Sequence, residues 1–395
     1  MRLSQSWRRA AVRFDEDNLV SCAGLVPVMR LAEDTGLHDL VADAVQIDDP
    51  PIPSTGVNPA GKVSAIVAGM AAGADSIDDL DLLRHGGMKE LFGGVYAPST
   101  LGSFLRAFTW GHVLQLAAAA RQFLLSLTER TPVLAGADQM TYVDIDALLR
   151  RVYGRKKEGA RFGHAKVGGY DVRLRGLSPL VTTVCAPVAA PLVAAVRLRA
   201  GNANSARGAA SLLAEALSTA RAAGASGPVL VRADSQYFAG KVVSAARRAG
   251  AMVSISVPAN KATRAAAAGI PAEQWQPVHY PEAVVDPDTG ELISDAQVAE
   301  TTCTAFAGTR HEVTGRLVVR RVRERGGEQD ELFPVWRYHA FFTTTSLSTV
   351  DADITHRQHA IVETVFADLI DGPLAHMPSG RFPANAACAR PSATT

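Results

Sequence analysis

The feature that most constrains the fold is the order of apolar runs between residues 136 and 257. Thr141–Ala147 reads as a short strand, and the β-branched runs Leu180–Ala186 and Leu192–Leu198 flank a proline-bearing turn, which predicts a hairpin. The later elements, in order, are a helix from Asn204 or Ser205 to about Ala223, a strand over Pro228–Arg232, a helix over Tyr237–Ala249 and a strand over Ala251–Val257. This order predicts an α/β mixed sheet in which three antiparallel strands precede crossover units that add parallel strands.

This order is that of a ribonuclease H-like domain, and the rest of the chain divides around it. The residues before it are mostly helical, with helices expected over Lys62–Ala74, from Ser76 and from Ser99 or Thr100 to about Leu127. Such short helices fit a helix-turn-helix module that binds DNA ends and an ordinary helical bundle equally well. The expected divisions are a helical N-terminal domain over 1–135, the first part of the core over 136–257, a β-rich insertion over 258–345, the last helix region of the core over 346–387 and an atypical tail over 388–395.

The bulk composition excludes several classes of protein. Hydrophobic residues make up 47% of the chain and charged residues 20%, as in globular domains, and no apolar run is long enough for a membrane span. The N-terminus lacks the apolar core of a signal peptide. The four cysteines are isolated, which argues against zinc ribbons and disulfide frameworks and favours a reducing cytoplasm. We expect a cytoplasmic protein with no membrane partner.

Positive charge is concentrated in one segment, although the net charge is only +1. Residues 150–176 hold nine lysines and arginines against Glu158 and Asp171, together with six glycines. This pattern predicts a flexible cationic loop suited to a phosphate backbone, whose counterions are released on binding. A solvated surface loop is the alternative. The candidate DNA contacts in the segment are Arg155, Lys156, Lys157, Arg161 and Lys166.

Carboxylates occur at three places in otherwise apolar surroundings. Asp144 and Asp146 alternate with Val143 and Ile145, so both acids point to the same face of their strand. Asp234 follows the buried strand Pro228–Arg232, at the strand end where α/β proteins build their sites. Glu363 lies among apolar residues on the late helix, which is expected to pack across that edge of the sheet. The predicted topology therefore brings these carboxylates together as candidate catalytic residues.

Carboxylate oxygens are suited to Mg²⁺ or Mn²⁺, and two such ions can activate a water or a sugar hydroxyl in a phosphodiester displacement. The expected ligands are Asp146, Asp234 and Glu363, with Asp144 as the alternative first acid. Other roles stay open at this point. Asp234 is also placed to cap a helix, one of the two acids on the first strand is expected to lie outside the metal site, and Glu363 fits a solvated helix face.

The chain resembles DDE transposases of bacterial insertion sequences, most closely the insertion sequence thirteen-eighty family. The matching segments, in order, are Tyr142–Asp146, Gly159–Gly163, Leu198–Ser205, Val231–Ser235, His356–Leu369 and Leu374–Phe382. The resemblance covers nearly the whole chain and implies metal-dependent cleavage of double-stranded DNA at terminal inverted repeats, followed by strand transfer into target DNA. It also implies a homodimer in a synaptic complex and a nucleoid-associated location. The first acid maps to Asp144 or Asp146, the second to Asp234 and the third to Glu363.

The sequence departs from the family pattern near its last acid. Relatives carry a Y-x-x-R-x-x-x-E signature, whose first two named positions are His356 and His359 here, and Ile370 replaces an expected lysine. Histidine can still donate to phosphate, so His356, Arg357 and His359 are further candidate DNA contacts. Relatives continue into a long apolar helix, which leads us to hypothesise a truncated copy.

Two other functions compete with an active transposase. One is a catalytically impaired copy that only binds DNA ends, and the other is a general nuclease on the same fold. The basic strand Arg316–Arg325 would hold DNA in any of these, or it forms an exposed β face.

Overall fold

The protein is described from a computed structural model, in which two compact units can be distinguished. The described residues are 16–48, 50, 52–92, 94–167, 170–278, 296–324, 335–372, 374–377 and 379–389. A helical unit comprises residues 1–123, 153–158 and 369–395, and a sheet unit comprises residues 124–152 and 159–368.

The helical unit is built from short helices. Its elements are α1 (Leu25–Asp34), α2 (Leu37–Ala44), α3 (Pro53–Gly56), α4 (Pro59–Ala71), the 3₁₀ helices η2 (Asp78–Arg84) and η3 (Gly86–Leu91), α5 (Pro98–Ala107), the first part of α6 (Trp110–Arg130) and α12 (Phe382–Cys388). The Asn58 side chain caps α4 by accepting from the Gly61 N–H, and Pro59 begins the helix. The single long helix predicted up to Leu127 is instead two helices, because Phe108 takes an extended backbone and buries its ring.

The sheet unit contains the seven elements that the sequence predicted, in the predicted order, with the unpredicted strands β2 and β3 after the first of them. Strand β1 (Thr141–Ala147) pairs antiparallel with β4 (Tyr170–Ala186), which pairs antiparallel with β5 (Ala189–Ala200). On its other side β1 pairs in parallel with β6 (Val229–Ala233), and β6 pairs in parallel with β7 (Met252–Ser256). The protein is therefore a mixed α/β protein with a large mixed sheet and flanking helices.

The glycine-rich basic segment does not form the flexible loop that its composition predicts. After β2 (Arg150–Arg151), β3 (Arg161–Val167) pairs with the first half of β4 as a hairpin. Gly163 and Gly176 allow close contact between strands. A Cβ added at Gly163 would lie 2.1 Å from the Gly201 carbonyl oxygen, and one at Gly176 would lie 2.3 Å from the Arg150 carbonyl oxygen.

Residues 258–345 contribute further strands to the same sheet. They form α9 (Lys261–Ala268), the 3₁₀ helix η5 (Ala272–Gln274), β8 (Gln276–Val278), β9 (Ala296–Ala305), β10 (Val313–Glu324) and β11 (Val335–Thr343). Strand β11 pairs antiparallel with β7, so the central sheet continues through β11, β10, β9 and β8. Residues 279–295 and 325–334 of the expected β-rich insertion lie outside the described residues.

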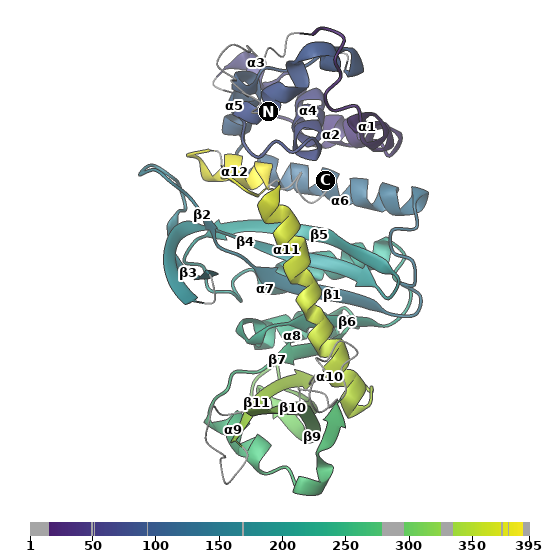
Figure 1. Cartoon of the computed structure of the whole chain (residues 1–395), viewed down its shortest axis with the longest axis vertical. Coiled ribbons are helices and arrows are strands. Elements are labelled where there is room, and N and C mark those ends of the chain that lie inside the picture. The colour runs from purple at the N-terminus through teal and green to yellow at the C-terminus, as the bar shows by residue number, and fades with distance from the viewer. Residues whose placement is uncertain are drawn as a thin grey trace, which may run out of the picture. The chain divides into compact units, whose positions relative to one another are not determined.

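Helices flank the sheet. Helices α7 (Ala209–Ala222) and α8 (Gly240–Arg248), with the 3₁₀ helix η4 (Ser235–Tyr237) between them, share a core with Val143 and Ile145 of β1. Helix α10 (Thr349–Arg357), the 3₁₀ helix η6 (Gln358–Ala360) and α11 (Ile361–Asp371) follow β11, and Figure 1 shows them running across the sheet. Helix α7 begins at Ala209, later than predicted, because residues 204–207 form turns and Gly208 adopts a φ of 79°.

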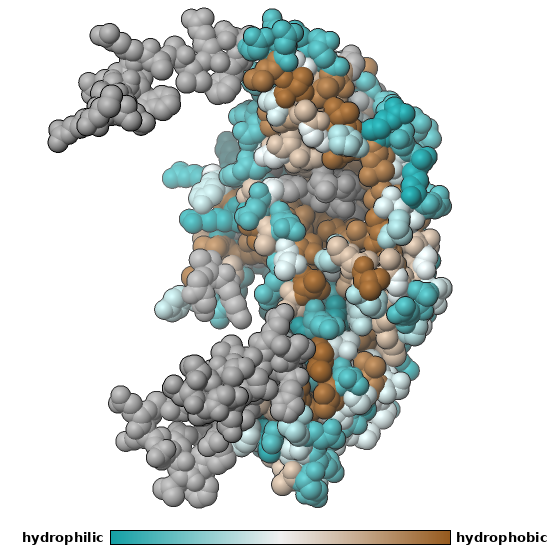
Figure 2. Space-filling model, turned by 45° about the vertical axis from the view of Figure 1, so that its right-hand side comes forward, coloured by the Kyte–Doolittle hydropathy of each residue, from teal (hydrophilic) through white to brown (hydrophobic). Residues whose placement is uncertain are grey.

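The surface mixes polar and apolar residues, as the face in Figure 2 shows. On α1 of the helical unit, Val26, Val28 and Leu31 are exposed. None of the helices within the described ranges has the length and apolar character needed to cross a membrane.

Candidate active site

The two acids of β1 share one face of the strand, as alternation predicts. Val143 and Ile145 lie in the core beneath α7, while Asp144 is buried on the opposite face. In the parallel pairing of β1 with β6, Asp144 stands directly beside Arg232. Strand register therefore sets an acid and a base side by side inside the protein.

Asp144 and Arg232 form a bidentate ion pair that is almost completely buried. The guanidinium donates from Nε to Oδ1 at 2.8 Å and from Nη2 to Oδ2 at 2.7 Å, and the two side chains are 0% and 1% exposed. The guanidinium also lies over the Tyr142 ring, 4.3 Å from its centroid. These contacts are the ones that a buried charge requires, because an unpaired ion in the interior is strongly destabilising.

The late helical segment is joined to this ion pair at two points. Arg232 Nη1 donates to the carbonyl oxygen of Thr355 at 3.1 Å, near the C-terminal end of α10. His359 Nδ1 lies 3.0 Å from Asp144 Oδ1, and the histidine side chain is 16% exposed. Because an ionised carboxylate only accepts hydrogen bonds, Nδ1 is the protonated ring nitrogen in this contact.

Asp146 and Asp234 directly follow Ile145 and Ala233, the last partners in the parallel pairing of β1 with β6. The pKa of Asp146 is raised from its ordinary value of 3.8 to about 6, first because the carboxyl is largely buried and then because of the negative charges of Asp234 and Glu363. The backbone N–H of Ala147 and the charge of His359 act in the opposite direction. The three acids and His359 are therefore near enough to interact electrostatically, although they come from β1, from the end of β6 and from the α10–α11 segment.

Glu363 is exposed, whereas Asp146 and Asp234 are both half-buried. Asp234 accepts from the Gln236 N–H at 2.9 Å and caps η4, which is the capping role that the sequence left open. Glu363 is exposed in the first turn of α11. Within the described ranges, no set of three or more His, Cys, Asp or Glu side chains is grouped tightly enough to hold a metal ion by itself.

His356 is packed into the sheet. Its ring nitrogens lie 2.9 Å from Ser254 Oγ and 3.0 Å from Ser256 Oγ, and its ring stacks on Phe341 at 4.1 Å between centroids. Burial, followed by the positive charges nearby, lowers the pKa of His356 to about 3, so the ring is neutral at physiological pH. Both ring nitrogens are thus occupied within the protein.

The predicted basic contacts lie in different surroundings. Lys157 of the helical unit donates to the carbonyl oxygens of Met377 at 3.1 Å and Ser379 at 3.0 Å, while Arg155 and Lys156 are exposed. In the sheet unit, Arg161 is exposed and its guanidinium donates to the Ala160 carbonyl. Lys166 belongs to β3, and its side chain is outside the described part of the structure.

The basic strand β10 is partly engaged within the sheet unit. Arg316 donates to Glu300 at 2.7 Å, and the Arg321 guanidinium lies between the rings of Trp275 and Trp336, 4.1 and 4.4 Å from their centroids. These contacts show how an arginine-rich strand is accommodated in a sheet. Arg325 lies outside the described residues.

Arg232 is the main site residue that sequence reasoning did not identify. The signal was a cation between the apolar residues Val231 and Ala233 of a buried strand, because such a charge needs a buried partner. Tyr237 was also missed. Its side chain is buried, and its pKa is raised mainly by burial and then by the charge of Asp146.

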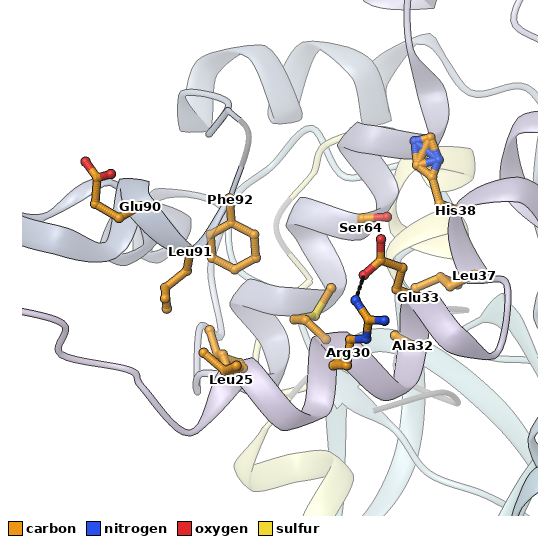
Figure 3. Close-up of a pocket in the computed structure, with 12 residues that line it drawn as sticks. Leu25, Arg30, Ala32, Glu33, Leu37, His38, Ser64, Glu90, Leu91 and Phe92 are labelled. Atoms are coloured by element: carbon orange, nitrogen blue, oxygen red, sulfur yellow. Dashed lines mark hydrogen bonds and ion pairs between the residues drawn. The ribbon is translucent and has the colours of Figure 1, made fainter.

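One cavity lies in the sheet unit and another lies in the helical unit. A cavity of 550 Å³ in the sheet unit is bordered by Asp234 and Ser256 together with Arg264, Tyr338 and His339. A second cavity, of 570 Å³, lies in the helical unit between α1, α2 and η3. Figure 3 shows it with apolar Leu25, Leu91 and Phe92 and with the Arg30–Glu33 ion pair. Of the three predicted acids, Asp234 lines the first cavity, whereas the second is an apolar groove of the helical unit.

A family model described as the group 1 transposase DDE domain matches residues 4–363. The chain belongs to this DDE transposase family. The match includes β1 and β6 and extends to Glu363, and the large mixed sheet with flanking helices is compatible with a DDE transposase fold. No curated protein matches the chain. The resemblance to DDE transposases is confirmed, whereas the narrower thirteen-eighty assignment stays a prediction.

Proposed function

We propose that this protein is a DNA transposase that cuts the ends of an insertion sequence and joins them to target DNA. The observation that carries the proposal is the parallel pairing of β1 with β6, in which Asp146 and Asp234 directly follow the last partners, Ile145 and Ala233. The charge of Glu363 also acts on the Asp146 carboxyl. Carboxylates that repel one another in a partly solvated site are stabilised by a divalent cation. Family membership supports a metal-dependent nuclease or transferase of this kind.

The donor set fits Mg²⁺ or Mn²⁺, because it consists of carboxylate oxygens without thiolates. Asp146, Asp234 and Glu363 would hold the ions, two in our proposal, and bound ions would activate the attacking hydroxyl and stabilise the leaving oxygen of the phosphodiester. With a pKa of about 6, the Asp146 carboxyl is mostly ionised at pH 7.5 and ready to accept a cation. The exposed Glu363 and the accessible Asp234 leave room for water and DNA oxygens in the remaining positions.

We propose Asp146 and not Asp144 as the first acid. Both oxygens of Asp144 accept from Arg232, and one of them also accepts from His359, in a site closed to solvent. Metal binding there would require the buried ion pair to separate. Asp146 lies two residues further along the same face and is electrostatically coupled to the other two acids.

We further propose that exposed Lys156 and Arg161, with Arg155, contact the phosphate backbone, and that the protein acts as a homodimer on inverted repeats of its own element. The ribonuclease H-like description of the core belongs to the same proposal, and the strand pairing supports it. His356 is left out of the DNA-contacting set because Ser254 and Ser256 occupy its ring nitrogens.

The test is cleavage of DNA that carries the flanks of the coding sequence, in Mg²⁺ or Mn²⁺. The variants are Asp234→Asn and Glu363→Gln, and Asp368→Asn is the matched control because it removes an exposed acid from the same helix. We expect the first two to abolish cleavage while retaining DNA binding, and the control to cut as the parent does.

Three results would contradict this proposal or the assignment of its acids. Binding of the ends without cleavage by the parent, at any metal concentration, would identify the DNA-end-binding alternative. Cutting without regard to the flanks would identify a general nuclease. Full activity of Asp234→Asn or Glu363→Gln would reject the assignment of the acids.

A further inference from the structure

We propose that the buried network of Asp144, Arg232 and His359 is a positioning device that sets the three metal-binding acids relative to one another. The inference rests on the proposed function, because it concerns how the same site is built. The network joins β1, β6 and the α10–α11 segment, which are the three elements that carry Asp146, Asp234 and Glu363.

Each residue of the network lies near one of the three acids in the sequence and on the same side of its strand or helix. Asp144 precedes Asp146 by two residues on β1, and Arg232 precedes Asp234 by two residues across the end of β6. Residues two apart in extended backbone point to the same side. His359 precedes Glu363 by four residues in a helical segment, where such residues are neighbours on one face. The buried contacts therefore fix the same three backbone segments from which the acids project.

The polar atoms of Asp144 and Arg232 make their hydrogen bonds within the protein, which argues for a positioning role and against direct contact with substrate. The Arg232 Nε and Nη2 atoms donate to Asp144, and Nη1 donates to the Thr355 carbonyl. The Asp144 carboxylate accepts from Arg232 and from His359. At 0% and 1% exposure, Asp144 and Arg232 have no surface on which DNA could lie.

The guanidinium is the group that this geometry requires. Its planar fork holds a carboxylate through two parallel hydrogen bonds and still has a third nitrogen for the helical segment. A lysine ammonium at the same position supplies a point charge, which can pair with Asp144 but cannot make all three contacts in fixed directions. The relative placement of β1 and the α10–α11 segment would then loosen while the charge stays balanced.

The test measures Mn²⁺ binding by electron paramagnetic resonance, with and without DNA, alongside the Mn²⁺ dependence of cleavage. The variants are Arg232→Lys and His359→Ala, with His359→Asn as a conservative rescue because an asparagine amide can donate from the place of Nδ1. The matched control is Arg197→Lys, since Arg197 pairs with Glu215 between β5 and α7, on the α7 side of the sheet. Cooperative melting of each variant establishes that it is folded.

We expect Arg232→Lys and His359→Ala to raise the half-saturating Mn²⁺ concentration about tenfold or more, as groups that orient metal ligands do. His359→Asn should recover most of this loss, and Arg197→Lys should bind Mn²⁺ as the parent does. If the parent cuts DNA and the folded variants Arg232→Lys and His359→Ala bind Mn²⁺ as tightly as the parent does, the positioning role is overturned. The proposed function is not affected by that result. A parent that neither binds Mn²⁺ nor cuts DNA overturns the proposed function and the inference with it.

Discussion

Replacing Asp146 by asparagine should stabilise the protein while abolishing its activity. Raising the pKa of this carboxyl from 3.8 to about 6 means that the folded protein disfavours its charged form. At about 1.4 kcal/mol per pH unit, the cost of ionising Asp146 in the folded state is about 3 kcal/mol at pH 7.5. Asparagine has nearly the same shape and carries no charge, so it avoids this cost.

The sign of the pH dependence follows from the direction of the pKa change. A group whose pKa is raised by folding favours the folded state below its unfolded pKa, and this contribution is lost as the pH rises through the folded pKa. The free energy of unfolding of Asp146→Asn should therefore exceed that of the parent by about 3 kcal/mol at pH 7.5 and by about half of that at pH 5.

The assay is urea unfolding of both proteins at the two pH values in the presence of a chelator, followed by the same measurement in Mn²⁺. We expect Mn²⁺ to stabilise the parent and so to reduce the difference in free energy of unfolding between Asp146→Asn and the parent, because a bound cation favours the ionised carboxyl. An Asp146→Asn variant that is less stable than the parent at pH 7.5, or whose advantage does not grow with pH, would refute the reasoning.

The remaining predictions concern His356 and the surface cations. Because burial lowers the pKa of His356 to about 3 from an unfolded value of about 6.5, its contribution to stability is lost as the pH falls below 6.5. Between pH 7 and pH 5, the free energy of unfolding of His356→Gln, measured with urea, should therefore fall by about 2 kcal/mol less than that of the parent. A pH dependence equal to the parent's would contradict the burial of a neutral ring. Lys156→Ala and Arg161→Ala should each lower the slope of log affinity against log salt by about 0.9 in DNA-binding titrations, and slopes equal to the parent's would remove these residues from the interface.

The sequence predicted the pairing of the strands that carry Asp146 and Asp234, because this pairing depends on strand order and alternation. Val143 and Ile145 had to face a core, so Asp144 and Asp146 had to face the other way. The parallel pairing of β6 beside β1 then brought the end of β6, with Asp234, to the same region. These steps need only the pattern of apolar residues and the usual rules of connection.

What the sequence did not predict depends on side-chain partners. The ion pair of Asp144 depends on Arg232, which stands opposite Asp144 only because of the particular register between β1 and β6. The pattern of residues does not encode that register. His356 was predicted to contact DNA because it occupies a position of the family signature, whereas its contacts with Ser254 and Ser256 depend on the fold.

The flexible loop was predicted wrongly for a related reason. Glycine is equally common where a chain is mobile and where two backbones approach closely. At Gly163 and Gly176 the second case holds, and it becomes visible only when the strands that contact these glycines are known.

The central claim, that Asp146, Asp234 and Glu363 share a divalent ion, is tested most directly by replacing Mg²⁺ with Fe²⁺ and mapping where hydroxyl radicals cut the polypeptide. We predict cuts at β1 near Asp146, at the end of β6 near Asp234 and in the first turn of α11 near Glu363, all lost in Asp234→Asn. Cuts confined to other segments, or cuts that persist in Asp234→Asn, would contradict the claim.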